Sequence, residues 1–326
     1  MTRAARHILF IIDPINTLAT DADSSFVMIS EAISRGHQVS WCETKDLFVQ
    51  NDNGWAHVRQ IELNSPLKGS TQKFQTIAEH THKLDEFAVI LMRKDPPFDE
   101  NYLLATWCLD YAGKNTWVIN DPNGLRSVNE KLAILHFPSL IPPTRILRRK
   151  SDLHQTLSEF GGQMVVKPVF GFGGREVLRV SCEDPNLNTL FELATHDEQR
   201  WTVAQAFVPE ANTGDKRILL VDGEPIGAVL RVPAIGDLRG NFHAGGSPTE
   251  TTLNPRDLEI CRAIKPFLRQ HGQFFAGIDV IGSYLTEINV TSPTGMQEIN
   301  RLGALSGQQT MQAQFWSRIE RKLERS

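Results

Sequence analysis

Three oxygen-bearing side chains near the carboxyl end of the chain have the types and spacing of a metal site. Glu287 and Asn289 are two residues apart, so an extended strand would point both side chains to one face. Asp279 precedes them in another predicted strand. A three-residue loop at 282–284 would set Asp279 directly opposite Glu287, whereas a two-residue loop would turn it away. Hard oxygen donors in small number suit Mg²⁺, which retains waters and shares substrate phosphates, so the pattern predicts a magnesium-binding hairpin.

A magnesium site of this kind works beside phosphates, and a glycine-rich segment offers a place to bind them. The sequence KPVFGFGG begins at Lys167 and lies between two apolar runs that predict strands. Gly171, Gly173 and Gly174 would let backbone N–H groups approach phosphates, and Lys167 adds a positive charge at the strand end. The segment matches neither the Walker A pattern nor the dinucleotide fingerprint. By itself a plain hairpin turn explains it equally well, and only the acidic hairpin favours phosphate binding.

The composition is that of an ordinary globular protein with a small acidic net charge. Of the 326 residues, 40% are hydrophobic and 22% are charged. The net charge is −4, whereas proteins that bind nucleic acids or anionic membranes usually carry a positive electrostatic field. The four cysteines show no C-x-x-C spacing, which indicates neither a zinc site nor a disulfide framework. The apolar run at 8–12 is too short for a signal or membrane-spanning segment. We expect a cytoplasmic protein that binds no nucleic acid and no membrane.

The first part of the chain alternates predicted strands and helices in the manner of an open α/β sheet. Strands are expected at 7–13, 37–43, 87–92 and 116–120. A helix is expected at 24–36, with Asp23 or Ser24 as its N-cap. The polar segment 51–83 has no clear period, and we expect a surface loop and one helix there. The turn sequence Asp-Pro-Asn-Gly then predicts the end of a first domain, 1–124.

Beyond this turn the pattern changes to two smaller α+β units. A helix is expected to continue through 129–131. Helices at 151–162 and 186–194 flank the glycine-rich segment, which predicts a small lobe at 125–204. The remainder, 205–326, predicts antiparallel strands that begin with a hairpin whose turn is Asp-Gly at 222 and 223.

The glycine-rich segment, its lysine and the acidic hairpin together resemble the ATP-grasp superfamily. Further segments resemble the prokaryotic glutathione synthetase family almost from end to end: DSSF at 23–26, MRKDPPFD at 92–99, NEK at 129–131, GDKR at 214–217, RGN at 239–241 and TEINVTSPT at 286–294. The resemblance implies an α/β N-terminal open-sheet domain followed by an ATP-grasp fold, whose two α+β lobes with antiparallel sheets close on ATP. It implies Mg²⁺ or Mn²⁺ as the metal, bound by Asp279, Glu287 and Asn289.

The resemblance also implies which residues bind ATP. Lys131 and Lys167 would contact the phosphates from opposite lobes, and Arg217 would stabilise the transferring phosphoryl group through its planar fork. Asp215 would meet the ribose or orient Arg217. The backbone that reads adenine would be contributed by Gln205, Ala206, Phe207 and Val208. Without the resemblance, solvated lysines, an ordinary strand and a surface salt-bridge patch explain these residues as well.

A second group of residues is expected to bind the other substrates. The positions are Asp13, Ser24, Ser25 and Arg93 at strand ends and a helix start, Arg239 and Asn241 in a lid, and Ser292 and Thr294 in the loop after the metal ligands. Open sheets place ligands at such strand ends, which favours docking of a peptide carboxylate there. The alternatives are that Ser24 is only a helix cap and that the lid is an ordinary surface loop.

The implied activity is ATP-dependent peptide-bond formation. The carboxylate of γ-glutamylcysteine would attack ATP to give an acyl phosphate and ADP, and glycine would then displace phosphate to give glutathione. The resemblance further implies a homo-oligomer. A related ligase with another amine acceptor, a non-catalytic ATP-binding scaffold and a simple peptide-binding protein stay open as alternatives.

One departure from the family lies in the glycine-rich segment. Relatives carry Asp-Gly where this chain has Phe170 and Gly171, so an aromatic ring replaces a polar contact near the phosphates. Two more departures, a lid with few glycines and Gln297 in place of a basic residue, leave the identity of the amine acceptor open.

Overall fold

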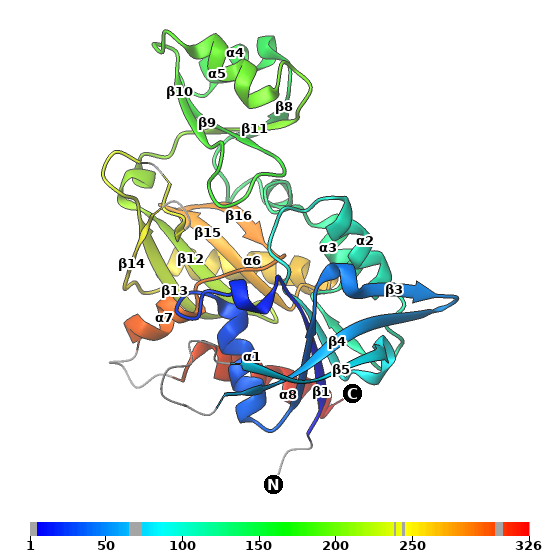
Figure 1. Cartoon of the computed structure of the whole chain (residues 1–326). Helices are drawn as coiled ribbons and strands as arrows, with labels where there is room; N and C mark the ends of the chain where they lie inside the picture. Colours follow the sequence, from blue (N-terminus) through cyan, green and yellow to red (C-terminus); the bar gives the residue numbers. More distant parts are fainter. Residues whose placement is uncertain (1–4, 65–73, 238, 243–244, 304–308, 326) are drawn as a thin grey trace.

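The computed structural model describes residues 5–64, 74–237, 239–242, 245–303 and 309–325. Figure 1 shows a large open sheet formed by the N-terminal third, a small green lobe set apart from it, and a third sheet between the two. The small lobe and the third sheet are each antiparallel and carry their own helices. The predicted architecture, an open α/β sheet followed by two α+β units, is therefore confirmed.

Seven strands form the first sheet within the described residues. Their order is β3 (Leu47–Gln50), β4 (Asn53–Leu63), β2 (Gln38–Cys42), β1 (His7–Ile11), β6 (Val89–Met92) and β7 (Trp117–Ile119), and β5 (Phe74–Lys83) pairs with β4. The central strands β2, β1, β6 and β7 are parallel. Alternate residues of β1 pack on opposite sides, towards α1 (Ser24–Ser34) and towards α2 (Glu100–Leu109). Burial on both faces explains the continuous apolar run that predicted this strand.

Helix α1 forms as its capping signal predicts. The Asp23 carboxylate accepts a hydrogen bond of 2.6 Å from the backbone N–H of Ser25, and Phe26, Ile29 and Ala32 are buried. The helix ends before Gly36, whose φ of +84° is a conformation that glycine adopts without strain. Of the two proposed caps, Asp23 is correct and Ser24 is not.

The prediction for segment 51–83 is wrong in its described part, which contains two long antiparallel strands. Ala56 and Val58 alternate inwards along β4, but the pairing with β5 shifts between Gln60 and Ile61. Ile61 packs on the opposite face of the sheet, with Val39 and Trp41, so the buried positions of β4 do not follow one period of two. Strand β5 has no buried residue in its whole length, so neither strand carried a recognisable hydrophobic pattern.

The helix predicted through 129–131 is also wrong, because α3 (Pro122–Ser127) ends earlier. The Asn129 side chain accepts hydrogen bonds from the backbone N–H groups of Lys131 at 3.0 Å and Leu132 at 3.1 Å. A side chain that binds its own backbone in this way competes with the helix. The freed connector lies along the third sheet, where the Glu130 carbonyl accepts from the backbone of Ile288 at 2.9 Å.

The small lobe has a sheet and a hydrophobic core of its own. Its strand order is β10 (Leu178–Ser181), β9 (Gln163–Pro168), β11 (Thr202–Ala206) and β8 (Thr144–Leu147), and its helices are α4 (Lys150–Glu159) and α5 (Leu187–Thr195). Leu153 and Phe191 from the helices pack on Met164 and Val166 of β9. The glycine-rich segment is the connection between β9 and β10, as predicted.

The third sheet is antiparallel and contains the acidic hairpin. Its order is β14 (Ser247–Thr249), β13 (Glu224–Val232), β12 (Asp215–Val221), β15 (Phe275–Ile281) and β16 (Tyr284–Asn289), with helices α6 (Pro255–Gln270), α7 (Met296–Gly303) and α8 (Met311–Leu323). Asp222 and Gly223 form the predicted turn, with φ of 54° and 74°. None of the described helices is both long and apolar enough to cross a membrane.

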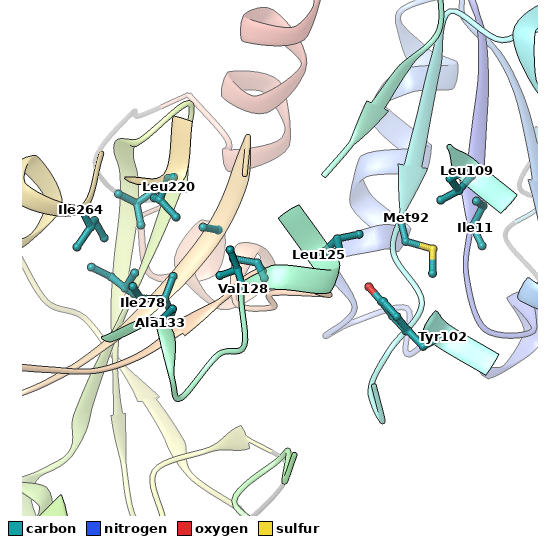
Figure 2. Close-up of a cluster of buried hydrophobic side chains, with 14 of the residues drawn as sticks. Ile11, Met92, Tyr102, Leu109, Leu125, Val128, Ala133, Leu220, Ile264 and Ile278 are labelled. Atoms are coloured by element: carbon teal, nitrogen blue, oxygen red, sulfur yellow. The ribbon is translucent and has the colours of Figure 1, made fainter. Parts of the chain in front are cut away.

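The first and third sheets share their hydrophobic core. Figure 2 shows Leu125 and Val128 between side chains of the first sheet, such as Met92, and side chains of the third sheet, such as Ile278. On the other face, the Trp316 indole of α8 donates a 2.8 Å hydrogen bond to the Met28 carbonyl of α1. These two sheets therefore form one packed body, and the limits proposed for the three segments remain a prediction.

Stability should fall with acidification because of His7 at the start of β1. Burial, with the neighbouring His82, lowers the His7 pKa from 6.5 to about 4. Between these values the unfolded chain binds a proton that the folded chain does not, so the free energy of unfolding decreases as pH falls. In urea unfolding, His7→Gln, which can still bond the Ser40 hydroxyl, should lose less stability than the wild type between about pH 7.5 and about pH 5. Equal losses in both proteins would contradict this, and the exposed His154→Gln is the control.

Candidate active site

A cleft of about 750 Å³ lies between the sheet of the small lobe and the third sheet. It collects side chains from the connector after α3, from the glycine-rich segment, and from strands β11, β12, β15 and β16. The predicted site residues that line it are Lys131, Lys167, Gly171, Gly173, Gly174, Gln205, Ala206, Phe207, Val208, Asp215, Arg217, Arg239, Asn241, Asp279, Glu287, Asn289, Ser292 and Thr294. The four remaining predicted residues, Asp13, Ser24, Ser25 and Arg93, do not line it.

The acidic hairpin has the predicted register but not the predicted loop. Asp279 is directly opposite Glu287, as expected, yet Ile281 pairs with Tyr284, so the loop has two residues instead of three. A bulge at Thr286 supplies the missing residue and restores the register. The Thr286 hydroxyl donates a 3.1 Å hydrogen bond to the Asp279 carbonyl at this point.

A network of buried charges spans the three neighbouring strands β13, β12 and β15. Arg217 donates two hydrogen bonds to Asp279, at 2.5 and 2.9 Å, and Arg231 donates two to Asp215, at 2.7 and 2.6 Å. Arg231 also lies 2.9 Å from Asp279 and thereby joins the two pairs. Arg231 is 3% exposed, and sequence reasoning missed it. The pattern concealed it because a bulge at Ile226 shifts the hairpin so that Arg231, rather than Leu230, pairs with Asp215.

The arginines decide the ionisation of the two aspartates. Burial favours the neutral form of Asp279, but Arg217 and Arg231 outweigh it and hold the Asp279 pKa well below its usual range. For Asp215, which pairs with Arg231 alone, burial dominates and raises the pKa. The interpretation of Asp215 and Arg217 as a surface salt-bridge patch is wrong. Arg217 is buried and bonds Asp279, and Asp215 bonds the buried Arg231.

The two predicted nucleotide lysines converge on Glu287. The Lys167 ammonium lies 3.3 Å from the Glu287 carboxylate and the Lys131 ammonium lies 3.9 Å from it, although the two lysines come from different segments. Burial lowers the Lys167 pKa against the attraction of Glu287. Burial would raise the Glu287 pKa, but the two lysines outweigh it and lower that pKa. With exposures of 4% for Lys131 and 6% for Lys167, neither is the solvated lysine of the alternative interpretation.

The connector also brings in Glu130, a cleft residue that we did not predict. The Thr291 hydroxyl donates to its carboxylate at 2.8 Å, and burial raises its pKa despite the adjacent Lys131. The available signal was its position in the NEK segment, beside Lys131. The helix that we predicted there would have pointed the two neighbouring side chains in different directions, so the signal was missed.

The glycine-rich segment and the predicted lid meet over the cleft. Gly174 has a φ of +74°, and a Cβ atom there would lie 2.9 Å from the Asn241 amide oxygen and 3.3 Å from Arg239 Cδ. Glycine is therefore required by conformation and by space. Lys131 donates a hydrogen bond to the Gly171 carbonyl, which fixes the segment from below. The Arg239 guanidinium donates three hydrogen bonds to the Asp237 carboxylate of the same loop.

The opposite end of the cleft is apolar and suits a flat ring. It is formed by the segment 205–208 with Val165 and Ile281. Gln205 is fixed by a 2.9 Å hydrogen bond to the Thr144 hydroxyl, and the Arg179 guanidinium lies 4.0 Å from the centre of the Phe207 ring. These residues combine a rigid backbone with a hydrophobic wall, as nucleobase sites require.

The four N-terminal residues bond to segments at or near the edge of the cleft, and only Ser25 and Arg93 bond to each other. Arg93 donates to the Ser25 hydroxyl at 3.2 Å and to the Pro293 carbonyl at 3.1 Å, and its buried Nη1 has no hydrogen-bond partner among the described residues. The Asp13 carboxylate accepts from the backbone of Asp95 at 3.0 Å. The Ser24 hydroxyl accepts from the Met296 backbone at 3.3 Å. A buried guanidinium nitrogen without a partner is the kind of group that a substrate carboxylate would satisfy.

The metal-binding hypothesis is supported by the chemistry of the donors. Asp279, Glu287 and Asn289 all line the cleft, and the Asn289 amide donates to Asp279 at 3.3 Å. Carboxylate and amide oxygens are the donors that Mg²⁺ and Mn²⁺ prefer. In the described part of the chain, no group of three or more His, Cys, Asp or Glu side chains could hold a metal, so the set depends on the asparagine.

Two facing antiparallel sheets, preceded by an open sheet and joined by a glycine-rich segment over the cleft, define an ATP-grasp protein. The crystal structure of D-cycloserine synthetase DcsG has the same fold, with a TM-score of 0.65, 13% sequence identity and coverage of 97% of this chain and 99% of that one. At this identity the likeness concerns the fold alone.

The chain belongs to the prokaryotic glutathione synthetase family. The model of that family's N-terminal domain matches residues 7–126, and the model of its ATP-grasp domain matches residues 130–304. Glutathione synthetase of Gloeobacter violaceus is 45% identical over 301 residues, which cover 90% of this chain and 92% of that protein. Glutathione synthetase of Vibrio vulnificus is 40% identical over 316 residues, which cover 96% and 97%. The predicted family is confirmed, and with it an ATP-dependent ligase.

Loss of Arg231 should destabilise the protein strongly. Arg231→Met would leave the buried Asp215 without a cation and Asp279 with only one, and an uncompensated buried charge costs about 3–5 kcal/mol. Urea unfolding would measure the change. The matched control is Arg269→Met, which removes the same two-point contact from an exposed pair with Asp222 and should cost at most about 1 kcal/mol. Similar losses in both variants would contradict the structural role of the network.

Proposed function

We propose that this chain joins γ-glutamylcysteine to glycine with hydrolysis of ATP to ADP and phosphate, giving glutathione. The observation that carries the proposal is the convergence of Lys131 and Lys167, from two separate segments, on one carboxylate beneath the glycine-rich segment. Two buried cations beside backbone N–H groups are what a polyphosphate requires. Membership of the glutathione synthetase family supports the choice of substrates.

The first chemical step is attack by the terminal carboxylate of the dipeptide on the γ-phosphorus of ATP. Its products are an acyl phosphate and ADP. Lys131 and Lys167 bind the phosphates and neutralise the charge that develops on the leaving ADP. Because both lysines are buried, water screens their charges poorly. The same burial restricts movement of the two side chains during the reaction.

Arg217 is placed to stabilise the phosphoryl group in this step. Its Nε and Nη2 are bonded to Asp279, which fixes the plane of the guanidinium. Its Nη1 points to the loop after the acidic hairpin, 3.4 Å from the Thr294 carbonyl. This nitrogen can exchange a weak contact for a charged oxygen of the acyl phosphate without movement of the side chain.

In the second step, the amine of glycine attacks the acyl phosphate and phosphate leaves. We assign the dipeptide to the edge of the cleft near Asp13, Ser24, Ser25 and Arg93, where the unpartnered Arg93 nitrogen would bind a carboxylate. Ser292 and Thr294 would bind the peptide backbone or glycine. Arg239 and Asn241, which touch the glycine-rich segment, would exclude water from the acyl phosphate.

We further propose that Glu287, Asn289 and Asp279 hold Mg²⁺, or Mn²⁺ in its place. The ion would supply positive charge at the phosphate oxygens, as a Lewis acid does. The residues themselves place two carboxylates and an amide on the hairpin strands, and Glu287 lies beside both lysines. Finally, we propose that the protein acts in the cytoplasm as a homo-oligomer. Light scattering would determine the mass of the oligomer.

Purified protein with ATP and Mg²⁺ should release ADP only when γ-glutamylcysteine and glycine are both present, and mass spectrometry should detect glutathione. Lys167→Ala should lower kcat/KM by about 100-fold or more, because one phosphate cation is lost. The control Lys265→Ala removes a half-buried lysine that does not line the cleft and should have no effect. ADP release with the dipeptide and a different amine would overturn the acceptor alone, and nucleotide binding without turnover would favour the scaffold alternative.

Removal of a metal ligand should show itself in metal binding as well as in activity. Glu287→Gln should raise the Mn²⁺ dissociation constant, followed by electron paramagnetic resonance of the free ion, by about tenfold or more. Glu176→Gln, in an exposed pair with Arg200, is the control. Unchanged Mn²⁺ binding in Glu287→Gln would refute the assignment of this carboxylate.

A further inference from the structure

The glycine-rich segment carries a large apolar side chain at its surface. Phe170 is 64% exposed, although it lies next to glycines that line the cleft. Its ring is stacked near that of Phe98, with ring centres 6.5 Å apart and planes inclined by 24°. Phe98 belongs to the segment that follows β6 and packs on the buried Tyr102, at 4.9 Å between ring centres. The pair therefore connects the small lobe to the core of the main body.

The backbone on either side of Phe170 is fixed to the same body. The Val169 carbonyl accepts a hydrogen bond of 3.4 Å from the Asn129 amide, and the Gly171 carbonyl accepts one from Lys131. Gly171 admits no side chain, because a Cβ atom would lie 2.5 Å from Pro168 Cγ. The backbone at Phe170 is thus held close to the connector, and the ring lines a small hollow there.

Beneath the ring is a small hollow of about 50 Å³. Its walls include Phe98, Leu125, Val128 and Phe172, so it is largely apolar. A separation of 6.5 Å lies near the far end of the range of about 4.5–7 Å at which aromatic rings attract each other. Closer approach of the two rings would fill the hollow and remove the exposed face of Phe170 from water, which the hydrophobic effect favours.

We propose that Phe170 is a positioning residue that packs against Phe98 when nucleotide is bound and so holds the glycine-rich segment over the phosphates. The inference rests on the proposed function. A single exposed phenylalanine needs no explanation, but here the ring has an aromatic partner on the other unit and a hollow that fits its approach. The small lobe has a separate core, and this apolar contact joins it to the body at the point where the nucleotide phosphates bind.

A double-mutant cycle tests this contact. The wild type, Phe98→Leu, Phe170→Leu and the double variant are compared by calorimetric titration with ADP and Mg²⁺, and by KM for ATP. Each single variant should weaken nucleotide binding by about twofold to tenfold, and the double variant should bind no more weakly than the weaker single variant. Phe170→Tyr should restore wild-type binding. The melting temperature of Phe170→Leu should not change, since an exposed side chain contributes little to folding.

The matched control is Leu193→Ala, which removes an apolar side chain of similar exposure, 60%, from α5 of the same lobe. It should leave nucleotide binding unchanged. The inference would be overturned if Phe170→Leu bound ADP as tightly as the wild type, or if the two single effects simply multiplied in the double variant. Glutathione formation by the wild type would still uphold the proposed function in that case. Coupled effects on ADP binding with no glutathione formed by the wild type would refute the function and keep the inference.

Discussion

The active site depends on a buried network of two arginines and two aspartates. Asp279 belongs to the proposed metal site, yet it is bonded to Arg217 and lies within 2.9 Å of Arg231. Four charged groups can be removed from water only when each of them has a partner of opposite charge. Arg231 meets this condition because it contacts both Asp215 and Asp279. The network aligns strands β13, β12 and β15 side chain by side chain, and it fixes the plane of Arg217 before any substrate arrives. Preorganisation of this kind means that little rearrangement is required during phosphoryl transfer.

The architecture divides the labour between one large body and one small lobe. The body holds the proposed metal ligands, the arginines and the residues proposed to bind the dipeptide, on sheets that share a core, so these groups are fixed relative to one another. The lobe contributes Lys167, the glycine-rich segment and most of the apolar wall, and it has its own core. In the proposed function, the nucleotide would therefore bridge two units, whereas the peptide substrate would be bound within one. This division fits a reaction in which the phosphate donor must be enclosed and the acceptors must be oriented.

Much of the site could be predicted from local patterns, because strand alternation and glycine placement are local properties. Lys167, the glycines and the pair of Glu287 and Asn289 follow from such patterns. The parts that could not be predicted depend on backbone irregularity. The bulge at Thr286 corrects the register of a shorter loop, and the bulge at Ile226 brings Arg231 into the network. In addition, a side chain that bonds its own backbone ends the helix before Lys131, and β4 changes its buried face along its length. These features shift a register by one residue, stop an element early or change the buried face of a strand, and a search for a single period detects none of them.

The packing of α8 against α1 has a consequence for the order in which the chain can fold during synthesis. The apolar layer formed by Phe10 of β1 and by Met28 and Ile29 of α1 is covered by Phe315 and Trp316, nearly three hundred residues later. During synthesis, this apolar layer therefore stays uncovered until α8 has been made. At roughly 5–20 residues per second, this interval is on the order of 15 seconds to a minute. The packing of the first sheet is thus completed by a segment that is synthesised long after the sheet itself.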